Sequence, residues 1–97
     1  MILIREAFIT KPGMASKFAK MMRDAQNQVA GGKAKVRVMT DLTGSFNKVV
    51  METELESLGD LDKRMQEYRS NTKAKETMSG YTDMYLTGER EIFQLLD

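Results

Sequence analysis

Glu52 and Glu54 are the residues whose type and spacing best suit catalytic chemistry, because the sequence around them alternates with a period of two. A strand there would place both carboxylates on one face. Neighbouring carboxylates push their pKa values apart, and a general acid and a general base require that separation. The same glutamates can instead form ion pairs with Arg5 or Arg37, and this structural interpretation is the one we favour.

A small cationic cluster follows the glycines at 31–32 and could hold an anion; its members are Lys33, Lys35 and Arg37. No phosphate-binding loop of the GxxxxGK[ST] type accompanies it, so a solvated strand end is the simpler interpretation.

Three tyrosines, Tyr68, Tyr81 and Tyr85, could line a pocket between a sheet and its helices. The chain also has nine methionines, which are expected mainly to fill gaps in the core. Cavities lined by soft methionine side chains also suit adaptable apolar ligands.

The chain contains neither histidine nor cysteine. Most nucleophile–base dyads, the usual zinc sites and the commonest haem ligands are therefore missing, so we expect no metal and no cofactor. The net charge of +1 argues against a nucleic-acid partner, and no apolar run approaches the ~18 residues that cross a membrane. Early charged residues argue against a signal peptide, and a cytoplasmic location is the default expectation.

The elements that must position these side chains follow from the hydrophobic period. Residues 2–10 are largely apolar on both sides, which predicts a strand covered on both faces and ended by Pro12 and Gly13. Residues 14–29 carry an apolar stripe at spacings of three and four, which predicts a helix that the glycines at 31–32 end.

The segment 35–55 is expected to organise the fold as a β-hairpin. The sequence alternates with a period of two, with several β-branched residues, from Val36 to Thr40 and again from Val49 to Leu55. Gly44 can adopt the positive φ of a turn at 42–45.

A second helix should begin after a Ser57 cap, break at 70–72 and continue over 73–78. The side chains that it should bury are Leu58, Leu61, Met65 and Tyr68. A final strand is expected from Tyr81 or Asp83 through Leu96, with Gly88 marking a bulge.

This order, β-α-β-β-α-β, predicts a single α+β domain over 1–97 with a ferredoxin-like fold, in which two helices cover one face of an antiparallel sheet. The expected core comprises Phe18, Met22, Val49, Met51, Leu61 and Met65. The bare face should carry Leu3, Ala7, Ile9 and Val50 beside Arg5, Glu52 and Glu54. An apolar face of that size predicts a homodimer that pairs two sheets face to face.

Two segments carry a family resemblance. REAFITKPGMASKF resembles the strand, Lys-Pro-Gly turn and helix opening of the dimeric α/β-barrel superfamily, and FNKVVMETELESLGDLDKRM resembles its third strand and second helix. The NIPSNAP-like proteins and the antibiotic-biosynthesis-monooxygenase group are the most similar branches. The resemblance implies two sheets that close into a barrel across a dimer interface. Haem-degrading and chlorite-dismutase-like members use a histidine that this chain lacks, so it implies neither activity.

Two functions follow as hypotheses. The first is a small dimeric NIPSNAP-like protein without a conventional catalytic site, which could bind a small apolar or aromatic ligand. The alternative, implied by resemblance alone, is a cofactorless monooxygenase, favoured by a pocket that holds Asn47 or a tyrosine beside an arginine. The candidate catalytic residues are Arg5, Asn47, Glu52 and Tyr68. RNA binding is disfavoured because the third strand lacks stacking aromatics, and a small-molecule regulatory domain would need an enzyme to regulate.

Overall fold

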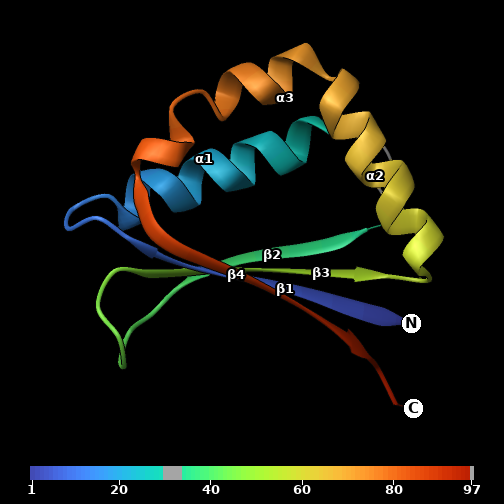
Figure 1. The fold of residues 1–97 in the computed structure, drawn as a ribbon, viewed down its shortest axis with the longest axis horizontal. Helices are drawn as coiled ribbons and strands as arrows, with labels where there is room; N and C mark the ends of the chain where they lie inside the picture. Colours follow the sequence, from blue (N-terminus) through green and yellow to red (C-terminus); the bar gives the residue numbers. More distant parts are fainter. Residues whose placement is uncertain (30–33, 97) are drawn as a thin grey trace.

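The computed structural model describes residues 1–29 and 34–96. The antiparallel sheet has the order β2-β3-β1-β4. Its strands are β1 (Ile2–Thr10), β2 (Lys35–Thr40), β3 (Lys48–Leu55) and β4 (Tyr85–Gln94). All of the described helices lie on one side of it (Figure 1), namely α1 (Ala15–Gln28), α2 (Leu58–Ser70) and α3 (Thr72–Thr77). The predicted α+β, ferredoxin-like architecture is confirmed, with the second helix divided into α2 and α3.

The central strand, β1, has the bounds that its sequence predicts. It pairs with β3 on one side and β4 on the other. Alternation turns Ile2, Ile4 and Phe8 toward the helices, and Ile4 is only 2% exposed. The predicted hairpin is also confirmed, since β2 and β3 pair from Lys35 opposite Glu54 onward.

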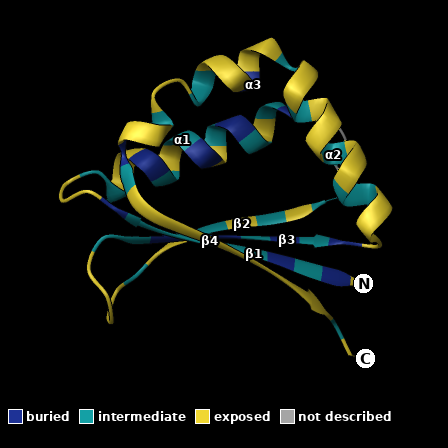
Figure 2. Cartoon of the chain, in the orientation of Figure 1, coloured by how far each residue is buried: buried dark blue, intermediate teal, exposed yellow. Residues whose placement is uncertain are grey.

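The core lies between α1 and the sheet. Figure 2 shows that buried residues concentrate on α1, β1 and β3, whereas α2, α3 and β4 are largely exposed. Phe18 on α1 is fully buried, and Met22, Val49, Met51 and Met84 complete the cluster around it. The ring of Phe18 meets that of Phe8 edge to face at a centroid distance of 5.1 Å. Four of the six predicted core residues are therefore confirmed.

The prediction for α2 is wrong at two positions, because Leu58 is 61% exposed and Met65 is 36% exposed. Ser57 does cap the helix, and its Oγ accepts a hydrogen bond from the backbone N–H of Asp60 at 3.3 Å. Leu61 is partly buried against Ile2, Ile4 and Leu55. The helix thus touches the sheet near its first turns, and a cavity separates the rest of it from the strands.

Asn71 makes the predicted break between α2 and α3. Its side chain caps α3 by accepting from the N–H of Ala74 at 2.9 Å, and it donates to the carbonyl of Gln28 on α1 at 2.8 Å. The Thr77 hydroxyl donates to Gln28 Oε1 at 2.8 Å. These bonds hold α3 on α1. The predicted end of α1 at Gly31 and Gly32, and Lys33 of the cationic cluster, lie outside the described residues.

The start of the last strand is a second correction. Residues Tyr81–Asp83 form a 3-10 turn after Gly80, whose φ of +82° is a left-handed conformation, and β4 begins only at Tyr85. The bulge lies at Leu86, between the Thr10–Tyr85 and Ile9–Thr87 pairs, and not at Gly88.

Gly88 has a packing role. It lies opposite Phe8, and an added Cβ would be 3.0 Å from two carbons of that ring. Phe18 and Tyr85 contact the ring edge to face, so moving it away from the added methyl group would disturb two aromatic pairs. Overpacking costs about 1–3 kcal/mol, and removing a glycine from a strand returns roughly 0.5–1 kcal/mol. Gly88→Ala should therefore destabilise the protein by about 1 kcal/mol in urea unfolding.

Gly59→Ala is the matched control for this change. The nearest atom to a Cβ at Gly59 is Ser57 Oγ at 3.6 Å, an ordinary contact. Because alanine is the better helix former, this variant should gain about 0.5–1 kcal/mol. An equal gain in stability for the two variants would show that the Phe8 ring moves easily to make room for the added methyl group.

Candidate functional site

A cavity of about 480 Å³ lies between the helix-facing side of the sheet and the helices. Ile4, Phe8, Phe18, Met22 and Met51 form much of its wall. The volume falls within the range of about 300–1,000 Å³ that is usual for small-molecule sites. The predicted tyrosine pocket is confirmed, because Tyr68, Tyr81 and Tyr85 all line this cavity.

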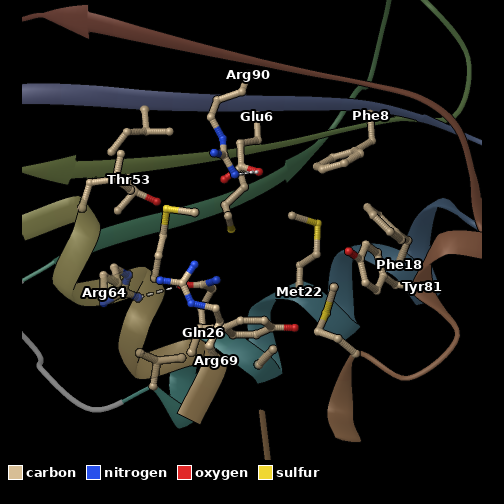
Figure 3. Close-up of a pocket in the computed structure, with 18 of the residues that line it drawn as sticks. Glu6, Phe8, Phe18, Met22, Gln26, Thr53, Arg64, Arg69, Tyr81 and Arg90 are labelled. Carbon is tan, nitrogen blue, oxygen red and sulfur yellow. Dashed lines mark hydrogen bonds and ion pairs between the residues drawn. The ribbon is translucent and has the colours of Figure 1, made fainter. Parts of the chain in front are cut away.

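One ion pair crosses the sheet side of the cavity. Glu6 and Arg90 are opposed on β1 and β4, and Arg90 Nη2 lies 3.5 Å from Glu6 Oε2. Figure 3 shows both side chains on the strand side of the cavity, facing the helices. Glu6 thus places a carboxylate between Ile4 and Phe8 on the helix-facing side of β1.

The helix side of the cavity carries two further arginines. Arg64 donates from Nη2 to Gln26 Oε1 at 2.7 Å, which joins α2 to α1. Burial lowers the pKa of the Arg64 guanidinium, and the nearby Glu67 carboxylate acts in the opposite direction. Arg69 lines the cavity from the end of α2 and is exposed to solvent. Figure 3 shows Arg64, Gln26 and Arg69 together on this side.

Tyr68 is the cavity residue with the perturbed phenol. Burial raises the pKa of its hydroxyl above the ordinary value of 10.0, and the neighbouring Tyr81 adds to this effect. Below pH about 10 the hydroxyl is protonated in both the folded and the unfolded chain. Above that pH the unfolded chain releases its proton first, so the stability of the fold should fall as the pH rises.

Tyr68→Phe should make this loss of stability at high pH less steep. The measurement compares free energies of unfolding at pH 9 and pH 11, and phenolate absorbance at 295 nm follows the titration itself. The variant should also lose the phenol whose pKa burial raises. The same slope in both proteins would contradict the burial of this hydroxyl.

The open face of the sheet holds two of the four predicted catalytic residues, Arg5 and Glu52. Arg5 Nη1 lies 3.2 Å from Glu91 Oε1, and Arg37 Nη2 lies 2.7 Å from Glu52 Oε1. Arg5 Nε also approaches Glu52 at 4.0 Å. The ion-pair interpretation is therefore confirmed for Glu52, whereas Glu54 pairs with Lys35 at 3.9 Å and not with either arginine.

The loop between β2 and β3 holds Asn47, the third candidate. Its φ of +63° is a left-handed conformation, and asparagine tolerates this better than most residues. Its carbonyl accepts from the Thr10 backbone N–H at 2.8 Å and from the Thr10 hydroxyl at 3.1 Å. Asn47 lines a separate hollow of about 510 Å³ beside the loop. Of the four candidates, only Tyr68 lies in the cavity.

Sequence reasoning missed the four charged residues of the cavity, Glu6, Arg64, Arg69 and Arg90. A signal existed for Glu6, because it is the one charged residue on the helix-facing side of β1. Arg64 had a weaker signal, since it lies four residues before Tyr68 and hence on the same helix face.

Within residues 1–29 and 34–96, no group of three or more Asp or Glu side chains is placed to hold a metal ion. Among the helices of the same part of the chain, none has the length and apolar character needed to cross a membrane.

Comparison with solved structures identifies the fold. An uncharacterized NIPSNAP domain protein from Burkholderia xenovorans matches with a TM-score of 0.81 and 13% identity, over 99% of this chain and 95% of that chain. A NIPSNAP family protein from Agrobacterium tumefaciens matches with a TM-score of 0.82 and 14% identity, over 99% of this chain and 93% of that chain. A putative antibiotic biosynthesis monooxygenase from Chloroflexus aurantiacus matches with a TM-score of 0.77 and 8% identity, over 99% of this chain and 93% of that chain.

No protein-family model and no curated protein matches the chain. The chain therefore has the ferredoxin-like fold found in NIPSNAP and antibiotic-biosynthesis-monooxygenase structures, as the resemblance implied. Structural matches at such low sequence identity establish the fold only, so the activity has to be inferred from the site.

Proposed function

We propose that the protein binds a small molecule with an aromatic or apolar body in the cavity between the sheet and the helices. The observation that carries this proposal is the lining, in which phenylalanine, methionine and tyrosine side chains surround about 480 Å³. Aromatic rings and adaptable thioethers suit flat apolar ligands.

We also propose that the chain acts as a homodimer through the open face of its sheet. Support comes from Leu3, Ala7, Ile9 and Val50, which lie together on the face that no described helix covers. A cytoplasmic location is the matching proposal for a chain without cysteine.

The neutral fluorophore N-phenyl-1-naphthylamine tests the binding proposal. Its fluorescence should rise on saturable binding of one probe per chain, with a dissociation constant in the micromolar range. Met65→Trp should weaken binding at least about tenfold, because Met65 lines the cavity and the larger ring would fill it. Leu58→Trp is the control on the same helix, since Leu58 is exposed and lies outside the cavity lining.

Absence of saturable binding would overturn the proposal. Equal affinity of the probe for Met65→Trp and for the unmodified chain would also overturn it, because the probe would then bind outside the cavity.

A second candidate function is a cofactorless monooxygenase, which one observation favours: Tyr68 and Arg64 line the same apolar cavity, one helical turn apart. In the simplest such reaction a phenol and O₂ give a quinone and water. One oxygen atom becomes the new carbonyl and the other leaves as water, and the phenol supplies all of the electrons.

Oxygen uptake with 1-naphthol tests this second function. One mole of O₂ should be consumed for each mole of 1,4-naphthoquinone formed, and Tyr68→Phe should slow the reaction at least about tenfold, within the usual contribution of proton transfer. Uptake no faster than in buffer would remove the enzyme hypothesis and leave the binding proposal intact.

A further inference from the structure

The charges that line the cavity are unbalanced. Arg64, Arg69 and Arg90 contribute three positive charges, and Glu6 contributes the only carboxylate among the lining residues that the structure describes, so the formal charge is +2. The pair formed by Glu6 and Arg90 neutralises one of the three arginines. The excess positive charge therefore lies on the helix side of the cavity, at Arg64 and Arg69.

Arg64 carries the more enclosed part of this excess. Its polar partner across the cavity wall is the neutral amide oxygen of Gln26, at 2.7 Å. No carboxylate lies within 4.0 Å of its guanidinium in the described part of the chain. By contrast, Arg5, Arg37 and Arg90 each pair with a glutamate.

A half-buried guanidinium is incompletely compensated when its hydrogen-bond partner is neutral and its nearby carboxylate, Glu67, lies beyond 4.0 Å. Arginine stays charged in proteins, so it cannot relieve the cost of burial by losing its proton. Partial loss of water raises that cost, which is also why burial lowers the pKa of Arg64. The guanidinium has five N–H donors, and the amide of Gln26 accepts from one of its nitrogens. Donors thus remain for an oxyanion such as a carboxylate or a sulfonate, two of whose oxygens can accept hydrogen bonds from one guanidinium.

We propose that the ligand of this cavity is an amphipathic organic anion whose acidic group is bound by Arg64. This inference rests on the proposed binding function and narrows the ligand to aromatic or apolar acids. The apolar body lies against Phe8, Met22 and Met51, and the carboxylate or sulfonate lies at the helix side. Arg69, exposed at the same end of the cavity, supplies attraction at longer range.

Two probes that differ chiefly in one anionic group test this inference. 8-Anilinonaphthalene-1-sulfonate carries a sulfonate that N-phenyl-1-naphthylamine lacks. The unmodified protein should bind the sulfonate at least about tenfold more tightly, as expected for a charge-assisted pair of hydrogen bonds. Arg64→Gln should abolish this preference and leave the affinity for the neutral probe within about twofold. Arg23→Gln, which removes an exposed arginine on α1, should leave the preference unchanged.

A purely structural role for Arg64 gives a different result. If it only joins α2 to α1, Arg64→Gln lowers both affinities in proportion and the ratio stays constant, which would overturn the inference. Equal binding of the two probes by the unmodified protein would also overturn it and needs no variant. Arg64→Lys, which keeps the charge but not the planar fork, should give an intermediate preference. If neither probe binds, the proposed function itself has failed.

Discussion

Phe18→Ala should destabilise the protein by about 3–5 kcal/mol, the usual cost of truncating a fully buried phenylalanine. The Phe18 side chain is 0% exposed and is the centre of the core cluster. Its ring contacts Phe8 and Tyr85 at centroid distances of 5.1 and 5.9 Å, so its loss also removes two aromatic pairs. Because small domains have only about 5–15 kcal/mol of stability, this variant should unfold at much lower urea concentrations, as followed by circular dichroism.

Phe46→Ala is the matched control because it removes the same side chain from an exposed loop. Phe46 is 88% exposed, and surface substitutions usually change stability by less than about 0.5 kcal/mol. Similar losses in both variants would mean that α1 does not pack on the sheet as described.

The periodic spacing of apolar residues was enough to predict most of the sheet and the first helix. Strand β1 and the β2–β3 hairpin each have a period of two that turns one set of side chains to the core, and the observed registers follow it. The apolar stripe of α1 likewise identified Phe18 and Met22. In these elements the pattern and the burial agree because the element lies directly on its partner.

The same reasoning failed for α2 and β4 for a physical reason. An apolar stripe tells which side of a helix turns inward, but not how far the helix stands from the sheet. Met65 turns toward the strands yet lines a cavity, which leaves it 36% exposed. The 3-10 turn at Tyr81–Asp83 precedes β4, and the bulge at Leu86 appears only in the pairing of β4 with β1, so an alternating pattern predicts neither.

The candidate site was predicted only in part. The three tyrosines were predicted to line a pocket between the sheet and the helices, and they do, but the charged residues of the pocket come from segments that are distant in sequence. Gln26 and Arg64 are 38 residues apart and meet only when α1 and α2 cover the sheet. No spacing rule relates such residues, so the pairing required the fold.

The open face of the sheet is the basis of the largest effect that we expect on assembly. Cross-strand pairing places Phe93 beside Leu3 and Met39 beside Val50, which extends the apolar area beyond the four residues that the sequence predicted. At about 25 cal/mol per Å² of apolar area, covering such a face is strongly favourable. We therefore expect a homodimer that buries about 2,000 Å² or more, as obligate interfaces do.

Glu52→Arg should weaken this dimer at least about tenfold and lower its melting temperature, because subunits of obligate dimers are rarely stable alone. Glu52 lies between two cations, with Arg37 at 2.7 Å and Arg5 at 4.0 Å, and its side chain is only 19% exposed. Reversing its charge would place three guanidinium groups together at the centre of the face, where burial makes their repulsion costly.

Glu76→Arg changes the net charge equally, but Glu76 lies on α3, on the other side of the sheet, so it should leave the dimer intact. Sedimentation equilibrium at low micromolar concentration measures both variants. Glu52→Arg should shift the mass toward the 11.0 kDa chain, whereas the control and the unmodified protein should show twice that mass. A compact 11.0 kDa species for the unmodified protein would contradict the dimer, because its apolar sheet face would then be stable in water.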